Sequence, residues 1–244
     1  GDYQLGTVQS DTMSYAWEGT RAFESTGKVD SFRVVAGLYA ESVQLVTMDP
    51  NIKTPADLKG KAVSIGAPGS GVYFNAIDVL NAAGLTENDI SAQYQSFADS
   101  ADALKDGKID AAFVVAGAPT PAITELCTTN SAYLVPIDGA VADAMMASCP
   151  FYTTYQIPAG TYPGQDEDVT TVTVKATLIV SASASEDDVY KLTAAIFDNA
   201  ADIAKENGKG AELSLENATT GMTAPFHKGA AKYFAEKGIT VDAQ

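Results

Sequence analysis

The spacing of hydrophobic residues changes several times along the chain between a strand-like and a helix-like pattern. From position 61 onward, short runs rich in Val, Ile and Ala alternate with segments in which apolar residues recur every three or four positions. These patterns predict strands at 61–67, 93–97 and 111–116, and helices at 72–84, 100–107 and 119–127. Strands that alternate with helices in this way form βαβ units, which favour a parallel sheet covered by helices on both faces.

The segments before and after this alternating region have a different spacing of apolar residues. Before it, the pattern predicts a strand at 3–8, a turn at 9–11, a helix at 12–23, two β-rich runs at 31–40 and 42–49, and a capped turn at 54–60. After it, the pattern predicts a helix at 139–148, an irregular connection at 151–169, a strand at 171–182, a helix at 185–205 and short helices within 212–238. The irregular connection is rich in Pro, Gly and Tyr, which makes it a candidate hinge or lid.

The composition indicates a folded and strongly acidic protein. Hydrophobic residues make up 46% of the 244 positions, which excludes intrinsic disorder. Fifteen Lys and Arg stand against 31 Asp and Glu, and a formal charge of −16 disfavours nucleic acid and anionic membrane surfaces as partners. The same charge is also explained by solubility or growth in salt. Arg21 and Arg33 are the only arginines, so an anionic ligand would be held mainly by backbone N–H groups or lysines.

The two cysteines, Cys127 and Cys149, leave two alternatives open, a disulfide in an oxidising compartment or two buried thiols. The sequence has no CxxC and no cluster of His and Cys at metal-ligand spacing, so we expect neither a metal nor a cofactor. It has no apolar run of the length of a membrane span, and it does not begin with Met. Either the protein is cytoplasmic or processing removed a leader, and the absence of a start Met favours a processed or trimmed chain whose signal peptide has been removed.

A glycine-rich loop, 66–71, lies between a predicted strand and a predicted helix. Glycines let backbone N–H groups approach a ligand, and the N-terminus of the following helix favours negative charge, so the loop is a candidate anion site. It is not a Walker A loop, because Val72 stands where that motif needs Lys, and it lacks the GxGxxG order. The alternative is a tight turn capped by Ser70.

Motifs of hydrolytic enzymes are missing. The sequence contains no GxSxG, no HExxH and no SxxK followed by KTG. Its single histidine, His227, lies in a tail segment, and a lone histidine is usually structural. Asp187 and Asp188 lie at a predicted helix start, where carboxylates complement the helix dipole. Because no nucleophile, base and oxyanion hole can be assembled, we expect a protein without enzymatic activity.

Seven segments occur in one order along almost the whole chain: VQSD (8–11), AWEGT (16–20), LYAE (38–41), LKGKAVSIGAPGSG (58–71), IDAAFVVAGAPTPAI (109–123), IPAGTYPGQDEDV (157–169) and APFHKGAAKYFAEKG (224–238). In this order they resemble the TAXI family, the TRAP-associated extracytoplasmic immunogenic solute receptors of tripartite ATP-independent periplasmic transporters.

The resemblance implies an α/β fold of the periplasmic-binding-protein type (type II), with two lobes that each contain a mostly parallel sheet flanked by helices. Lobe I would comprise 1–50 with 170–244 and lobe II 51–169, joined by crossing hinge strands. Against the family pattern, Gly1 falls after the opening elements of lobe I, so we expect that lobe to be incomplete at its N-terminus. The resemblance also implies a periplasmic or extracytoplasmic location, in a bacterium or an archaeon.

The family implies a small carboxylate as ligand, a glutamate-like amino acid or a dicarboxylate, bound in an interlobe cleft without a cofactor. We predict that the contacts come from Gln9, Tyr39, Glu41, Gly69, Ser70, Gly71, Val72, Val115 and Gly117. Glu41 would hold the ammonium group of an amino acid, or else would be a carboxylate that is exposed or bonded within the hinge. Tyr162 would be a ring that packs in the hinge or lid rather than one that touches the ligand.

The expected partner is the membrane subunits of a TRAP permease, and the receptor itself is expected to be a monomer. The alternatives are the ligand-binding sensor domain of a signalling receptor, the binding protein of an ATP-driven importer and, least favoured, an enzyme on a similar fold. An enzyme would need a titratable pair of side chains in the cleft.

Overall fold

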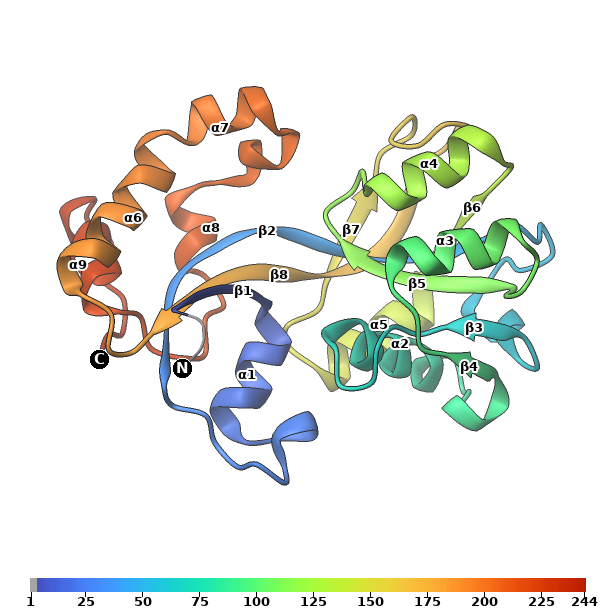
Figure 1. Cartoon of the computed structure of the whole chain (residues 1–244), viewed down its shortest axis with the longest axis horizontal. Coiled ribbons are helices and arrows are strands. Elements are labelled where there is room, and N and C mark those ends of the chain that lie inside the picture. Colours follow the sequence, from blue (N-terminus) through green and yellow to red (C-terminus); the bar gives the residue numbers. More distant parts are fainter. Residues whose placement is uncertain (1–3) are drawn as a thin grey trace. The chain divides into compact units, whose positions relative to one another are not determined.

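The structure is a computed structural model that describes residues 4–244, so the predicted strand residue Tyr3 lies outside the described part (Figure 1). The chain forms two compact units, Gly1–Ala40 with Lys175–Gln244 (unit 1) and Glu41–Val174 (unit 2). The chain passes between them in the long strands β2 (Phe32–Thr47) and β8 (Val169–Ser181). We expected the chain to pass from one lobe to the other after residues 50 and 169, and in the structure it passes from one unit to the other after residues 40 and 174.

Unit 2 contains the alternating strands and helices. Its elements are the 3₁₀ turns Pro55–Leu58 and Glu87–Asp89, β3 (Ala62–Ser64), α2 (Gly71–Ala82), β4 (Ser91–Gln93), α3 (Phe97–Lys105), β5 (Ala111–Ala116), α4 (Pro121–Thr129), β6 (Tyr133–Val135), α5 (Gly139–Ser148) and β7 (Thr153–Ile157). Strand β5 was predicted with the bounds that the structure has.

The strands of unit 2 form a mixed part of the sheet, in the order β2, β5, β3, β4. Strand β3 is parallel to both β4 and β5, as the βαβ pattern predicts. Strand β5 is antiparallel to β2, with Ser42 opposite Ala116 and Thr47 opposite Ala111. Strand β7 is antiparallel to β8. The parallel pairs therefore lie in the βαβ region, and the long strands that leave the unit run antiparallel to their neighbours.

Alternate residues of β5 face two different cores, because successive side chains of a strand point to opposite faces of the sheet. Phe113 packs against α2 and α5 together with Val63 and Leu45. Val114 packs on the other face, against α3 and α4. Figure 1 shows these two pairs of helices on opposite sides of β5. Unit 2 is therefore a three-layer α/β/α unit.

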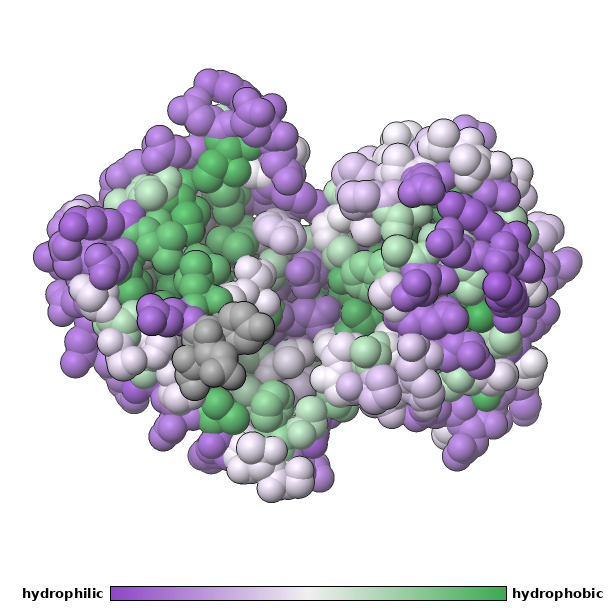
Figure 2. Space-filling view, in the orientation of Figure 1, coloured by the Kyte–Doolittle hydropathy of each residue, from purple (hydrophilic) through white to green (hydrophobic). Residues whose placement is uncertain are grey.

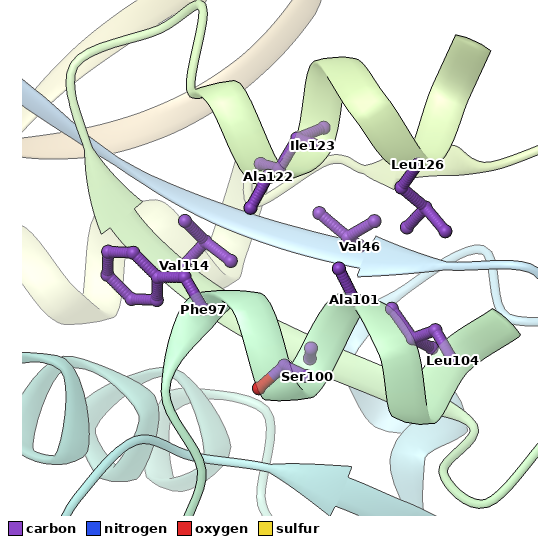
Figure 3. A pocket seen from close by; sticks show the side chains of 10 residues that line it. Val46, Phe97, Ser100, Ala101, Leu104, Val114, Ala122, Ile123 and Leu126 are labelled. Atoms are coloured by element: carbon purple, nitrogen blue, oxygen red, sulfur yellow. The ribbon is translucent and has the colours of Figure 1, made fainter. Parts of the chain in front are cut away.

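The second of these cores is apolar and tightly packed. In Figure 3, Val46 of β2, Val114 of β5 and Leu126 of α4 point into one space that side chains of α3 also line. The cavity left between them is about 10 Å³, roughly the room for one water molecule. Ser100 supplies the hydroxyl of this lining, and its Oγ is already bonded to the Ser96 carbonyl oxygen at 2.7 Å.

Unit 1 is built on one short strand and the outer halves of the two long strands. The short strand is β1 (Leu5–Gln9). The remaining elements are α1 (Ser10–Glu18), the 3₁₀ turns Arg21–Phe23 and Gly208–Glu212, α6 (Glu186–Asp198), α7 (Ala200–Glu206), α8 (Leu215–Thr219) and α9 (Lys228–Glu236). Strand β1 is antiparallel to β8. The unit's core is rich in aromatic rings, among them Phe226 and Phe234, whose ring centroids lie 5.8 Å apart.

Several predicted elements differ from the observed ones. The runs 31–40 and 42–49 form one continuous strand, β2, because Glu41 extends the strand instead of breaking it. The connection 151–169 was predicted to be irregular, but residues Thr153–Ile157 pair with β8. The predicted strand 93–97 stops at Gln93, since Ser96 caps α3 by accepting a bond from the Asp99 N–H at 3.2 Å.

We predict that Leu126→Ala lowers the free energy of unfolding by about 3 kcal/mol, because Leu126 is 1% exposed and its removal leaves a cavity in a packed core. Urea denaturation followed by circular dichroism measures this change. Thr128→Ala, at an exposed position of the same helix, is the control and should change the value by less than about 0.5 kcal/mol. Equal effects of the two substitutions would contradict the assigned packing.

Candidate functional site

The topology of unit 2 singles out one edge of its sheet. Strands β3 and β5 are parallel neighbours, and the helices that follow them, α2 and α4, cover opposite faces. In open α/β sheets ligands bind at such a switch point, outside the carboxyl ends of the two strands. We call the loop 66–72 after β3 and the turn 117–120 after β5 together the carboxyl edge.

The loop 66–72 has the backbone that an anion site needs. Gly66 has a φ of +77°, and a Cβ there would lie 2.9 Å from the Val72 side chain, so glycine is required. The Ser70 N–H donates to the Ala67 carbonyl at 3.0 Å, and Ser70 Oγ caps α2 by accepting from the Tyr73 N–H at 3.2 Å. The turn capped by Ser70 is therefore present at the N-terminus of α2, and the anion site in the same loop stays a prediction.

The predicted set of donors is reduced by these bonds. Because the Ser70 N–H is bonded inside the loop, it is not available to a ligand, which corrects its assignment as a ligand-binding amide. The N–H groups of Gly69, Gly71 and Val72 donate to no acceptor within residues 4–244. At the start of a 12-residue helix such groups attract negative charge. They are therefore the donors at the start of α2 that the carboxyl edge offers.

The turn 117–120 is held by a buried polar network that the sequence analysis missed. Tyr162 Oη donates to Gln44 Oε1 at 2.5 Å and accepts from the Thr120 N–H at 2.8 Å. Gln44 Nε2 donates to Thr120 Oγ1 at 3.0 Å, and Thr120 Oγ1 donates to the Gly117 carbonyl, also at 3.0 Å. A cis peptide bond joins Ala118 to Pro119. The only sequence signal for this network is a glutamine inside an apolar strand run.

Burial is the main reason why the pKa of Tyr162 is raised, and its bonds with Thr120 act in the opposite direction. The hydroxyl therefore stays protonated at neutral pH and can serve as a donor. Since Tyr162 is 2% exposed, its ring packs inside unit 2. The sequence predicts such a packing role for Tyr162 rather than ligand contact.

The remaining predicted residues of unit 2 lie at or beside the carboxyl edge. Gly117 directly follows β5 and belongs to the edge. Val115 is 4% exposed and its side chain packs in the core with α2, so its role as a ligand contact remains a prediction. Glu41 precedes the pair of Ser42 and Ala116, and its carbonyl accepts a bond from Thr173 Oγ1 of β8 at 2.9 Å. The structure thus brings Gly69, Gly71, Val72 and Gly117 to one sheet edge.

Two predicted residues belong to unit 1. Gln9 ends β1 and directly precedes α1, and its Oε1 is buried without a hydrogen bond in the described chain. Tyr39 lines a groove of about 360 Å³ whose other lining is mostly apolar, including Leu38, Leu178 and Ile196. Figure 2 shows hydrophobic residues gathered on this unit beside α6 and α7. These positions remain predictions as ligand contacts.

Other candidate groups have structural roles. His227 is 4% exposed and caps α9: its Nδ1 accepts from the Gly229 N–H at 3.1 Å, and its Nε2 lies 3.1 Å from the Ala184 carbonyl oxygen. Cys127 and Cys149 are free thiols. They pack in different cores of unit 2, which corrects the disulfide alternative.

Within residues 4–244 no three metal-binding side chains gather into a group that could hold an ion. In the same part of the chain, no helix combines the length and the hydropathy needed to cross a membrane.

We predict that Ser70→Ala lowers the free energy of unfolding by about 1 kcal/mol, because the Tyr73 N–H loses its cap at the start of α2. Thermal unfolding measures this effect. Ser91→Ala, an exposed position outside any cap, is the control and should be neutral. A neutral Ser70→Ala would show that Ser70 does not cap the helix.

Comparison with known proteins supports the fold. A Bordetella bronchiseptica RB50 structure matches at 19% identity with a TM-score of 0.51, over 96% of this chain and 73% of that chain. An Archaeoglobus fulgidus protein matches at 12% identity with a TM-score of 0.50, over 86% of this chain and 62% of that chain. The periplasmic aliphatic sulphonate binding protein SsuA of Escherichia coli matches at 20% identity with a TM-score of 0.43, over 87% of this chain and 55% of that chain.

This chain thus spans about half the length of E. coli SsuA. The predicted α/β fold, with a sheet flanked by helices, is confirmed. The model of the NMT1-like family matches residues 1–238, nearly the whole sequence. The chain therefore belongs to the NMT1-like family.

Proposed function

We propose that this protein is an extracytoplasmic solute receptor that binds a small carboxylate through the N–H groups of Gly69, Gly71 and Val72. The observation that carries the proposal is the set of donors without acceptors at the start of α2, located at the switch point of the sheet. Membership of the NMT1-like family and the switch point between β3 and β5, where open α/β sheets bind ligands, support a receptor.

The distribution of cations supports recognition by backbone groups. Both arginines lie in unit 1, and Arg33 donates from Nη1 to the Asp30 and Phe32 carbonyls at 2.8 and 2.7 Å. The guanidinium of Arg21 lies over the Tyr15 ring, 5.1 Å from its centroid. No arginine fork therefore stands in unit 2, and an anion there would be bound by N–H groups and the dipole of α2.

The proposal includes no chemical step. The titratable side chain in the buried network around the turn 117–120 is that of Tyr162. Burial raises its pKa, so the hydroxyl stays protonated at neutral pH. Its partners are the side-chain amide of Gln44 and the backbone N–H of Thr120, which do not act as bases at neutral pH. The arrangement fits reversible binding and release, the activity of a transport receptor.

The finer proposal is a TAXI-type receptor, probed with L-glutamate, that delivers its solute to a TRAP permease. Reconstitution with TRAP membrane subunits in vesicles tests this delivery. The expected result is uptake of labelled solute that needs this protein and a sodium or proton gradient. Uptake that needs ATP and an ATPase subunit would assign the protein to the alternative class, the binding proteins of ATP-driven importers.

Native mass spectrometry of the purified protein identifies a retained ligand. We expect an added mass that disappears on denaturation and that belongs to a compound with a carboxylate group. A retained compound without an anionic group would contradict the proposed ligand class.

We predict that Gly71→Val weakens the binding of L-glutamate by at least about tenfold, because a β-branched side chain crowds the first N–H groups of α2 and a lost bond to a charged group costs about 1.5–3 kcal/mol. Isothermal titration calorimetry measures the dissociation constant. Ala140→Val places the same β-branched side chain at an exposed first-turn position of α5 and should leave the affinity unchanged. Unchanged affinity of Gly71→Val would remove the α2 N-terminus from the proposed site.

A further inference from the structure

Strand β7 stands between two buried tyrosines that bond to opposite sides of the sheet. Tyr152 directly precedes the strand and Tyr162 follows it by five residues. They are 3% and 2% exposed, so their hydroxyls need partners inside the protein. The Tyr162 hydroxyl bonds to the turn 117–120 of the carboxyl edge, and the Tyr152 hydroxyl bonds to α2, the helix that follows the loop 66–72.

Tyr152 bonds to α2. Its Oη accepts from Asn75 Nδ2 at 2.7 Å and donates to Asp78 Oδ2 at 3.0 Å. Asn75 lies one helical turn after Gly71, the first residue of α2, on the same face of the helix. A tyrosine from another part of the chain therefore fixes the rotation and height of the turn that presents the Gly71 and Val72 N–H groups.

Tyr162 bonds to the start of α4 on the other face of the sheet. Without its Oη, the Thr120 N–H and Gln44 Oε1 would both lose their partners. Thr120 in turn holds the Gly117 carbonyl. The tyrosine thereby fixes the turn that follows β5.

The chain between the tyrosines is itself held firmly. Strand β7 pairs with β8 from Thr153 opposite Thr173 to Ile157 opposite Val169. Beyond the strand, Gln165 Nε2 donates to the Ile157 and Pro158 carbonyls at 3.1 and 3.0 Å. Asp168 Oδ1 accepts from the Ala159 N–H at 2.8 Å. Both hydroxyls are thus attached to one braced segment that is paired with β8.

We propose that Tyr152 and Tyr162 are positioning residues, which from the two ends of β7 fix α2 and the turn 117–120 and thereby set the geometry of the ligand-binding amides. The inference rests on the proposed function for its consequence in binding, and on the hydrogen bonds of unit 2 for the positioning itself. We call the hydrogen bonds of Tyr152 to α2 and of Tyr162 to the turn 117–120 the two clamps. Strand β8, which leaves unit 2, supports both clamps because β7 is paired with it.

Amide hydrogen exchange of the free protein, followed by NMR, tests the positioning. The reporters are the Phe74 N–H, bonded to the Ser70 carbonyl in α2, and the Thr124 N–H, bonded to the Thr120 carbonyl in α4. We expect Tyr152→Phe to accelerate exchange at Phe74 by about tenfold or more, and Tyr162→Phe to do the same at Thr124, each without effect on the other reporter.

The matched control is Tyr233→Phe in unit 1, which also removes a hydroxyl from a buried ring. In the wild type this hydroxyl donates to Asp198 Oδ1 at 2.8 Å. It should lower stability without accelerating either reporter selectively. If Tyr162→Phe does not fold, Gln44→Met removes the acceptor of the same bond and should accelerate Thr124 in its place. Uniform acceleration across unit 2, or no acceleration, would overturn the positioning role.

Titration with L-glutamate separates this inference from the proposed function. We expect Tyr152→Phe and Tyr162→Phe each to weaken binding by about fivefold or more while Tyr233→Phe does not. Selective exchange effects in a protein whose wild type binds no L-glutamate would leave the clamps established and would refute the proposed ligand. Full affinity in both variants would overturn the clamps as determinants of binding.

Discussion

Unit 2 depends on the position of β5, which is bonded to β2 on one side and to β3 on the other. Its alternate side chains must satisfy two cores at once, so a shift of one residue would turn Phe113 and Val114 to the wrong faces. The same strand order forces α2 and α4 onto opposite faces. The carboxyl edge is a consequence of this constraint, because the loops after β3 and β5 then diverge and leave N–H groups without partners.

Buried polar groups explain how the edge keeps its form. Each helix that starts there has amides that the helix cannot satisfy. In α4 the Thr120 N–H is bonded by Tyr162, and in α2 the Tyr73 N–H is bonded by Ser70 Oγ. The N–H groups of Gly69, Gly71 and Val72 are among those left without a protein acceptor within residues 4–244. A small anion would complete the set, which is why we place the ligand there.

Much of this architecture could be predicted from local patterns. The period of apolar residues located β5 and α5, and the glycines with Ser70 located the loop before α2. The bond that occupies the Ser70 N–H could not be predicted, because it depends on the course of the backbone within the loop. The contacts of Gln44 and Tyr162 join positions 118 residues apart, and no periodicity reports such a pair. Strand β7 was missed because its apolar face consists of only Tyr155 and Ile157, within a segment rich in Thr, Pro and Gly.

The central claim is that the carboxyl edge of unit 2 binds a small carboxylate through free backbone N–H groups. NMR titration of the ¹⁵N-labelled protein with L-glutamate tests it most directly, since each N–H gives its own signal. The account predicts saturable shifts that are largest at Gly69, Gly71, Val72 and Gly117, with smaller shifts at Ser70. Saturable binding that leaves these signals in place and shifts others would contradict it.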